Sequence, residues 1–288
     1  MHAPVCAIIV NYNKLPYSRL CLESILQSDP LPAQIVCIDN GSSDGTREYL
    51  SDELPGLAQA AGVDYGLIIN EGNAGAITAR NQGLEVAAQP LVAFCDNDLA
   101  VRSRNWLNVL QDVLERDPRN GFVGPKLVYP FAPYDIECAG VAISPHGRVQ
   151  YRGRGEPIDA PEFNRPSEVQ CLISACWLMR KEITDTLGGM DEIFNPAQFE
   201  DFDLCYRARE KGWRVLYEPN AEMYHFENVT TDGSVDMKFK YTTMKNWQEF
   251  KARWKRLYEH ENGPSDEHCQ WARLPTHPIE YTGIPPIV

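Results

Sequence analysis

Short apolar segments alternate with helix-like segments along the first third of the chain, and this alternation restricts the possible folds more than any other feature. The apolar segments are rich in β-branched residues, and stretches with apolar residues at helical spacing separate them. They lie at residues 5–10, 34–39, 65–70 and 91–95. Strands that alternate with helices form βαβ units, whose parallel sheet is covered by helices on both faces. The sequence therefore predicts an α/β fold with a Rossmann-like, mostly parallel central sheet flanked by helices.

The second part of the chain has a less regular pattern. A helix is predicted near residues 106–116 and a strand at 122–128, and a segment rich in Gly, Pro and charged residues follows at 129–170. Residues 213–217 suit a short strand that ends at Glu218-Pro219. This part of the chain is therefore predicted to depart from a simple βαβ order.

The C-terminal region combines a predicted helix with a Pro-rich tail. Residues 235–258 suit a long helix, because apolar side chains recur there at helical spacing. Those side chains are Trp247, Phe250, Trp254 and Leu257. We expect them to face the core. From Asn262 onward the frequent prolines predict an extended tail or one that wraps the surface. The helix and the tail could form a dimer arm or close the domain, and the sequence leaves both open.

The net charge limits the kinds of partner. It is -13 over 288 residues. Nucleic acids and anionic lipids are themselves strongly negative, so a chain this acidic has no overall attraction to them. We therefore expect no nucleic-acid partner. An anionic nucleotide substrate would need a local cation beside it.

The cysteines indicate a reducing environment. Their number, nine, is odd, and no two are spaced C-x-x-C. Cys6, Cys37 and Cys95 lie within predicted strands, where a thiol behaves as a small hydrophobic group. This favours reduced core residues over disulfides or zinc ligands. We find no signal-peptide pattern and no apolar run of the ~18 residues that a membrane span needs, so a cytoplasmic protein without a transmembrane segment is expected.

Two carboxylates one residue apart follow the predicted strand at 91–95. They belong to the triplet Asp96-Asn97-Asp98. Mg²⁺ is commonly held by one or two carboxylates together with substrate phosphates. A strand that ends in Asp-x-Asp can therefore hold a divalent cation beside a diphosphate. Taken alone, the triplet is a weak indication, because a solvated turn is its usual explanation.

Other polar residues also follow predicted strands. Asn11 and Asn13 come after the first strand, and Asp39 and Asn40 come after the second. Ligands of parallel α/β sheets bind at the carboxyl ends of the strands. We therefore expect these side chains and the Asp-x-Asp triplet to converge on one crevice.

Six segments occur in an order that resembles the family-2 glycosyltransferases with the GT-A fold. They are IIVNYN (8–13), CIDNGSSDGT (37–46), NAG (73–75) with ARNQG (79–83), DND (96–98), FEDFDL (199–204) and YH (224–225). The order is most similar to the branch that includes rhamnosyltransferase-like enzymes of polysaccharide assembly. The resemblance implies a GT-A domain over 1–228, in which 1–100 bind the nucleotide and 101–228 the acceptor. Residues 229–288 would add a C-terminal helix and tail packed on the same domain.

The resemblance implies inverting transfer of a sugar from a nucleoside diphosphate to an acceptor hydroxyl. In this family the aspartate after the second strand accepts a hydrogen bond from the base or ribose of the nucleotide. The residues assigned to the donor are Asn11, Tyr12, Asp39, Arg80, Asp96 and Asn97. Two alternatives stay open: Asp39 could instead begin an Asx-turn, with Asp44 capping the next helix, and Arg80 could form a surface salt bridge.

The same resemblance implies a divalent metal, Mn²⁺ or Mg²⁺, beside the diphosphate. Asp98 would be a direct ligand and His225 would complete the site, while Asp96 would contact the ribose or a metal-bound water. An imidazole ligand favours Mn²⁺ over Mg²⁺. The metal would act as a Lewis acid on the developing diphosphate charge.

Asp201 is the candidate general base by resemblance. The neighbouring Glu200 and Asp203 could raise its pKa by like-charge repulsion. The alternative is that the three acids simply favour a helix N-terminus, and both explanations can hold. Glu200 and Trp177 are assigned to the acceptor, Trp177 by stacking on a sugar face.

The donor nucleoside and the acceptor are less well defined. Asp39-Asn40 stands where the family often has two aspartates, which favours UDP or TDP as the donor nucleotide, with GDP also open. The acceptor would be a glycan or a lipid-linked sugar, and the latter is compatible with a peripheral position at the inner membrane face. Two other functions stay open: a nucleotidyltransferase of the same fold, and a catalytically silent nucleotide-sugar-binding or scaffold protein. The first would want a Gly-rich loop where residues 11–16 contain no glycine.

Overall fold

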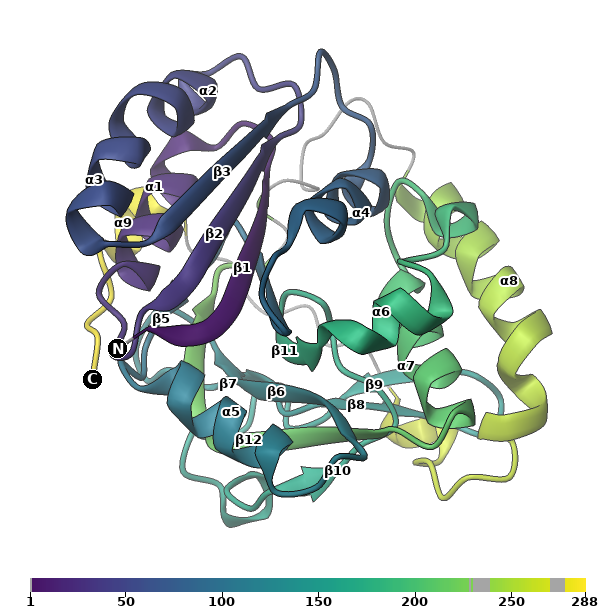
Figure 1. Cartoon of the computed structure of the whole chain (residues 1–288). Helices are drawn as coiled ribbons and strands as arrows, with labels where there is room; N and C mark the ends of the chain where they lie inside the picture. The colour runs from purple at the N-terminus through teal and green to yellow at the C-terminus, as the bar shows by residue number, and fades with distance from the viewer. Residues whose placement is uncertain (1, 228, 230–238, 270–277) are drawn as a thin grey trace.

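A computed structural model describes residues 2–227, 229, 239–269 and 278–288 (Figure 1). Its strands are β1 (Ala3–Asn11), β2 (Pro32–Asp39), β3 (Asp64–Ile69), β4 (Leu91–Asp96), β5 (Leu99–Val101), β6 (Asn120–Val128), β7 (Ile136–Cys138), β8 (Val141–Ile143), β9 (Val149–Tyr151), β10 (Ser167–Glu168), β11 (Cys176–Arg180) and β12 (Arg214–His225). Its α-helices are α1 (Leu15–Ile25), α2 (Thr46–Glu48), α3 (Leu54–Ala61), α4 (Ala76–Val86), α5 (Trp106–Glu115), α6 (Lys181–Leu187), α7 (Glu200–Glu210), α8 (Phe239–Tyr258) and α9 (Ile279–Thr282). A π-helical turn, η1 (Tyr49–Glu53), and three 3₁₀ turns, η2 (Pro161–Phe163), η3 (Glu192–Phe194) and η4 (Asp266–His268), complete them.

The main sheet contains both the regular first third of the chain and the later strands. Its path runs β10-β12-β6-β11-β4-β1-β2-β3, with β5 beside β12 and β7 beside β6. Strands β1 to β4 are parallel, and Figure 1 shows α1 to α3 on one side of them and α4 on the other. Strand β11 joins antiparallel to β4. The predicted α/β fold with a mostly parallel sheet and flanking helices is confirmed.

The strand register brings the predicted polar residues to one edge of the sheet. Asn11 lies opposite Asp39 in the β1–β2 pair, and Val10 lies opposite Asp96 in the β1–β4 pair. Buried apolar residues hold these strands between the helices, because a parallel sheet covered on both faces needs apolar side chains on both. The expectation that the strand ends converge on one edge is confirmed.

Strand β12 is longer than the sequence predicts. The expected end at Glu218-Pro219 is wrong, because the strand continues to His225. Pairing is irregular between Glu218 and Glu222, so Pro219 falls where no ladder hydrogen bond is needed. Beyond this irregularity β12 pairs with β6 and β5, and His225 lies opposite Leu99. This pairing brings the histidine next to the Asp-x-Asp turn.

The C-terminal part of the chain contains the helix α8 and a tail. The helix was predicted from residue 235, and residues 235–238 lie outside the described part of the chain. Phe250 and Trp254 are buried, as predicted, while Trp247 and Leu257 are half-buried. The end of the tail lies against β12, where the Pro286 carbonyl accepts a hydrogen bond from the Tyr224 hydroxyl.

The nine cysteines are free and buried, as predicted for core thiols. The main apolar core is continuous from β1 to α8. Among the described residues, no helix combines the length and hydropathy that a membrane crossing requires.

Candidate active site

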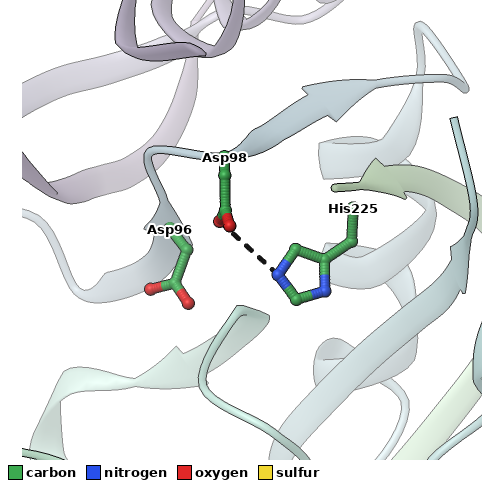
Figure 2. A group of neighbouring side chains, drawn as sticks. All are labelled: Asp96, Asp98 and His225. Atoms are coloured by element: carbon green, nitrogen blue, oxygen red, sulfur yellow. Dashed lines mark ion pairs between the residues drawn. The ribbon is translucent and has the colours of Figure 1, made fainter. Parts of the chain in front are cut away.

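Three side chains at the sheet edge form a compact group of metal-binding type (Figure 2). Asp96, at the end of β4, Asp98, in the following turn, and His225, at the end of β12, each place one ligand atom within 4.8 Å of the others. His225 Nε2 lies 3.5 Å from Asp98 Oδ1, the contact drawn as a dashed line. The carboxylate of Asp96 points into the same space. Two carboxylates and an imidazole form a donor set that suits Mn²⁺.

Burial and mutual attraction shift the ionisation of this group. Burial tends to lower the pKa of His225, but Asp98 and Glu137 outweigh it, and the pKa is raised well above its usual value. Burial tends to raise the pKa of Asp98, but His225 outweighs that effect and the pKa is lowered. Burial and the nearby Asp98 raise the pKa of Asp96, although Arg80 opposes them. Without a metal, His225 and Asp98 therefore form a buried ion pair.

Charged side chains also lie on the Nδ1 side of the His225 ring. Glu137, on β7, is fully buried, and one of its oxygens lies 3.4 Å from His225 Nδ1. Arg154 lies 3.5 Å from Glu137 and 2.8 Å from Glu227. The sequence analysis missed these residues, because Glu137 and Arg154 lie in the segment 129–170, where no motif distinguishes them from surface charges.

Arg80, on α4, connects the metal-binding group to the acidic pair of α7. Its guanidinium donates to Asp96 at 2.5 Å and to Glu200 at 3.0 Å, and both Arg80 and Glu200 are buried. The alternative of a surface salt bridge is therefore wrong, because the pair is internal. Arg80 positions Asp96 relative to α7. Donor binding by Arg80 and acceptor binding by Glu200 stay predictions.

Asp201 lies in the first turn of α7, with its carboxylate held by the backbone. Ser174 N–H donates to Oδ2 at 3.2 Å and Phe202 N–H donates to Oδ1 at 2.8 Å. Burial and the neighbouring Glu200 raise the pKa of Asp201 to about 8, against the opposing effect of these hydrogen bonds. The next carbonyl, that of Ala175, accepts from Asp96 N–H at 2.9 Å. Consecutive residues 174 and 175 therefore join Asp201 to the end of β4.

Asp203 faces away from this pair. It is fully buried and accepts hydrogen bonds from Arg207 at 2.7 Å and from the indole N–H of Trp254 at 2.9 Å. Its partners therefore come from the next turn of α7 and from α8. Asp203 anchors α7 to α8.

Trp177 is in the core. Its side chain is fully buried, with ring centroids 5.8 Å from Phe94 and 5.2 Å from Phe122. It has no surface to stack on a sugar, so its assignment to the acceptor is withdrawn. Trp177 lies opposite Phe94 in the β11–β4 pair, and alternation along β11 turns its ring onto this apolar face of the sheet, which the sequence pattern alone could not distinguish from a ligand-facing one.

The carboxylate of Asp39 holds the turn at the end of β2, but it accepts from the N–H three residues on, where an Asx-turn would use the residue two on. Asp39 is fully buried and accepts from Ser42 N–H at 3.1 Å and from Arg47 Nε at 2.7 Å. Asp44 accepts from the N–H and the hydroxyl of Thr46, the first residue of α2, but the N-cap position of this helix is Gly45, so the predicted cap at Asp44 is displaced by one residue. Arg47 was not predicted, and its charge lies beside the carboxylate assigned to the nucleotide. Binding of the nucleotide by Asp39 stays a prediction.

Asn40 has a structural explanation that corrects its use as a donor signature. Its amide donates to Asn73 Oδ1 at 3.0 Å and to the Gly75 carbonyl at 3.3 Å. Its oxygen accepts from Ala74 N–H and from Asn70, each at 3.0 Å. An aspartate could not make the two donations. The asparagine therefore follows from the loop that it holds and does not by itself indicate the donor nucleoside.

The remaining donor residues line the same edge. Asn11 is fully buried, and within the described residues its Oδ1 has no hydrogen-bond partner. Asn97 donates to the Ser18 hydroxyl at 3.0 Å and so fastens the Asp-x-Asp turn to α1. Tyr12 is half-buried, directly after β1. Their contacts with a donor stay predictions.

Comparison with known proteins identifies the class to which this arrangement belongs. The solved structure of GalNAc-T7 with UDP, GalNAc and Mn²⁺ superposes with a TM-score of 0.63, at 18% identity over 77% of this chain and 42% of that one. The mannosyltransferase PcManGT of Pyrobaculum calidifontis, in complex with GDP-Man and Mn²⁺, gives a TM-score of 0.57, at 19% identity over 78% of this chain and 57% of that one. The fold is thus that of the GT-A glycosyltransferases.

Sequence comparison then gives the family. The model of glycosyl transferase family 2 matches residues 6–188, and the chain belongs to this family. The predictions of a family-2 enzyme and of the GT-A fold are confirmed. Residues 200–203, 225 and α8 lie outside the matched segment, so their arrangement comes from the structure alone.

Individual relatives agree with the predicted branch. An N-acetylglucosaminyl-diphospho-decaprenol L-rhamnosyltransferase of Mycobacterium tuberculosis is 27% identical over 249 residues, which cover 78% of this chain and 76% of that protein. An uncharacterized protein, y4gI, of Sinorhizobium fredii is 28% identical over 263 residues. That alignment covers 87% of this chain but only 27% of the relative. The chain thus spans about a quarter of the length of y4gI.

Proposed function

We propose that the protein transfers a hexosyl or deoxyhexosyl group from a nucleoside diphosphate sugar to an acceptor hydroxyl, with a divalent metal and with inversion. The observation that carries the proposal is the group Asp96, Asp98 and His225, whose ligand atoms lie within 4.8 Å of one another. Asp201 is joined to the same strand end through residues 174 and 175. A metal-binding group and a basic carboxylate at one sheet edge meet the two main chemical needs of such a transfer.

The first need is to neutralise the leaving diphosphate. Asp96, Asp98 and His225 would hold Mn²⁺, which when bound supplies Lewis-acid stabilisation of the diphosphate charge. With Nδ1 directed at Glu137, His225 turns Nε2 toward Asp98, and a hydrogen bond from Nδ1–H would leave the Nε2 lone pair free for the metal. Arg80 fixes the position of Asp96.

The second need is to deprotonate the acceptor. The hydroxyl proton would move to a carboxylate oxygen of Asp201 as the hydroxyl oxygen forms its bond to the anomeric carbon. The bond from that carbon to the diphosphate oxygen breaks in the same displacement, which inverts the configuration. General bases work best when their pKa lies near the working pH, and the pKa of about 8 for Asp201 meets this condition.

The substrates are proposed by class. UDP, TDP and GDP sugars are the candidate donors, with Asp39 beside the base. The acceptor is a glycan or a lipid-linked sugar, and the rhamnosyltransferase relative, whose name contains a diphospho-decaprenol acceptor, supports the second. With such an acceptor the enzyme would work as a peripheral protein at the inner membrane face, in polysaccharide or glycoconjugate assembly.

Thermal unfolding with UDP, TDP, GDP, ADP and CDP, each with and without Mn²⁺, tests the site. A ligand that binds only the native state raises its stability by mass action. We expect one diphosphate to give a Mn²⁺-dependent shift that Asp98→Asn abolishes. Asp112→Asn, an exposed change of the same chemistry on α5, should keep the shift. If no diphosphate stabilises the protein with or without Mn²⁺, the silent scaffold function becomes the better account.

A further inference from the structure

The turn before Asp201 is strained and needs support from outside. Gln198 and Phe199 have φ angles of +84° and +72°, in the left-handed region that is unfavourable for a residue with a bulky side chain. This turn leads directly into the first residues of α7, Glu200 and Asp201. The position of the catalytic carboxylate therefore depends on whatever holds the turn.

One buried side chain of α8 holds it. Asn246 is fully buried, and its Nδ2 donates to the carbonyls of Phe194, Ala197 and Gln198 at 2.6, 2.9 and 3.0 Å. Its two N–H groups are therefore shared among three carbonyl oxygens. Unpaired buried carbonyls are costly, so this one amide satisfies a segment that has no ladder of its own.

Further contacts join α8 to the same region. The Trp254 indole N–H donates to Asp203 at 2.9 Å, and Arg253 reaches both Asp203, at 3.2 Å, and Asp191, at 2.8 Å. The Phe250 ring lies 5.5 Å from that of Phe199. Figure 1 shows α8 running alongside α6 and α7, away from β1 to β3. Helix α8 therefore supports the segment that carries the proposed general base, Asp201, and lies away from strands β1 to β3.

We propose that Asn246 is a positioning residue for Asp201, because it fixes the turn 194–199 that presents the catalytic carboxylate. The inference rests on the proposed function, in which Asp201 is the general base. It makes the C-terminal helix a part of the active site, although α8 provides no group that touches the reacting atoms.

The test replaces the side-chain amide of Asn246 by a group of nearly the same shape. Asn246→Asp removes both N–H donors and places a carboxylate against three carbonyl oxygens. Gln248→Glu makes the same chemical change on the exposed face of the same helix and is the matched control. Trp254→Phe removes the indole N–H together with part of the ring volume and serves as the second variant if Asn246→Asp does not fold.

The first readout is amide hydrogen exchange of the full-length protein. We expect exchange in residues 194–202 to rise by about tenfold or more in Asn246→Asp, and less in Trp254→Phe, with no change in Gln248→Glu. The strands β1 to β4 should keep their protection in all variants. Unchanged exchange in 194–202 would overturn the proposal.

The second readout is Mn²⁺-dependent hydrolysis of UDP-glucose, TDP-rhamnose or GDP-mannose, whichever the wild type hydrolyses fastest. We expect kcat to fall ~10–100-fold in Asn246→Asp, because a shift of about 1 Å in a reacting group costs this much, while the KM for the donor stays within about twofold. The acid limb of the pH profile should move to lower pH as Asp201 gains solvent. The titratable groups that face Asp201 are Glu200, beside it, Arg80, on α4, Tyr151, on β9, and Cys171.

The outcomes separate the two proposals. Wild-type kcat and an unmoved acid limb in folded Asn246→Asp would overturn the positioning role while leaving the proposed function intact. A wild type that hydrolyses none of the three donors and binds no diphosphate would overturn the proposed function and the catalytic meaning of the turn with it. In that case hydrogen exchange would still show whether Asn246 holds the turn 194–199.

Discussion

Glu137 and His225 face each other at the base of the metal-binding group, with an oxygen of the glutamate 3.4 Å from the Nδ1 of the histidine. Both side chains are buried. A carboxylate in this position fixes which ring nitrogen carries the proton, and so which one is free for a metal. The segment 129–170, which contains no recognisable motif, thus contributes directly to the site.

Glu137→Gln should weaken metal binding. An amide at this position can still accept a hydrogen bond but no longer provides the charge that favours the imidazole orientation, and losses of about 10–100-fold in metal affinity are typical for such partners. Titration of Mn²⁺ by electron paramagnetic resonance in the presence of the preferred diphosphate measures the effect. Glu162→Gln, an exposed change on η2, is the control and should bind like the wild type. Equal affinities in the two variants would argue against the role given to Glu137.

Mn²⁺ affinity should rise with pH through and above neutrality. The pKa of His225 is raised by Asp98 and Glu137 against the effect of burial, so the metal must displace a proton from the imidazole. The same shift makes the ion pair contribute stability below the unfolded pKa of ~6.5, which is lost as pH rises through the higher folded value. Calorimetric titration at several pH values in two buffers of different ionisation enthalpy counts the proton released. In His225→Ala this proton should disappear.

Asp201→Asn should abolish most of the transfer and change the pH dependence of stability. A general base contributes typically 10²–10⁴-fold, so the rate should fall by about this factor. The folded pKa of about 8 lies above the unfolded value of ~3.9, so the wild type loses stability as pH rises between these values. The variant lacks this loss.

Urea unfolding at pH 5 and pH 8.5 checks the second part of that prediction. The stability of Asp201→Asn relative to the wild type should increase from the lower to the higher pH. The slope is the informative quantity, because both oxygens of Asp201 accept backbone hydrogen bonds and the new amide changes the absolute value at every pH. Parallel pH dependences in the two proteins would contradict the raised pKa.

Asn40→Asp should destabilise the fold without changing the donor preference. The new carboxylate would face Asn73 Oδ1 and the Gly75 carbonyl, to which the amide now donates. Leaving buried acceptors without donors costs about 1–3 kcal/mol, and urea unfolding would measure it. Asn108→Asp, exposed on α5, should be nearly neutral. A switch of the stabilising diphosphate in Asn40→Asp would instead restore this position as a determinant of the nucleoside.

The sequence predicts the parallel part of the fold well, for a clear physical reason. Strands β1, β2 and β4 are buried on both faces, so their apolar runs stand out, and the polar residues that end them lie at one edge by register. The sequence does not indicate the pairing of His225 with Leu99. A proline usually ends a strand, and only the pairing of β12 with its neighbouring strands shows that Pro219 interrupts this strand without ending it.

The sequence could not indicate the contacts that support the site. Glu137 is a single polar residue in a segment whose pattern suits a surface, and its burial depends on which elements pack over it. Asn246 precedes Phe250 by four residues and so lies on the buried face of α8, but the sequence does not show which backbone groups it meets. Trp177 shows the opposite error, since an aromatic residue near the expected acceptor half is in the core. A motif identifies side chains that touch a ligand more readily than the side chains that hold them.

The most direct test of the account is the release of nucleoside diphosphate from UDP, TDP and GDP sugars, with Mn²⁺ and with EDTA, by the wild type and by Asp98→Asn. We predict release from one donor in Mn²⁺, little release in EDTA, and little release by Asp98→Asn under either condition, while Asp112→Asn behaves as the wild type. Undiminished release by the wild type in EDTA, or by Asp98→Asn in Mn²⁺, would contradict the claim that Asp96, Asp98 and His225 form the metal site of a sugar transferase.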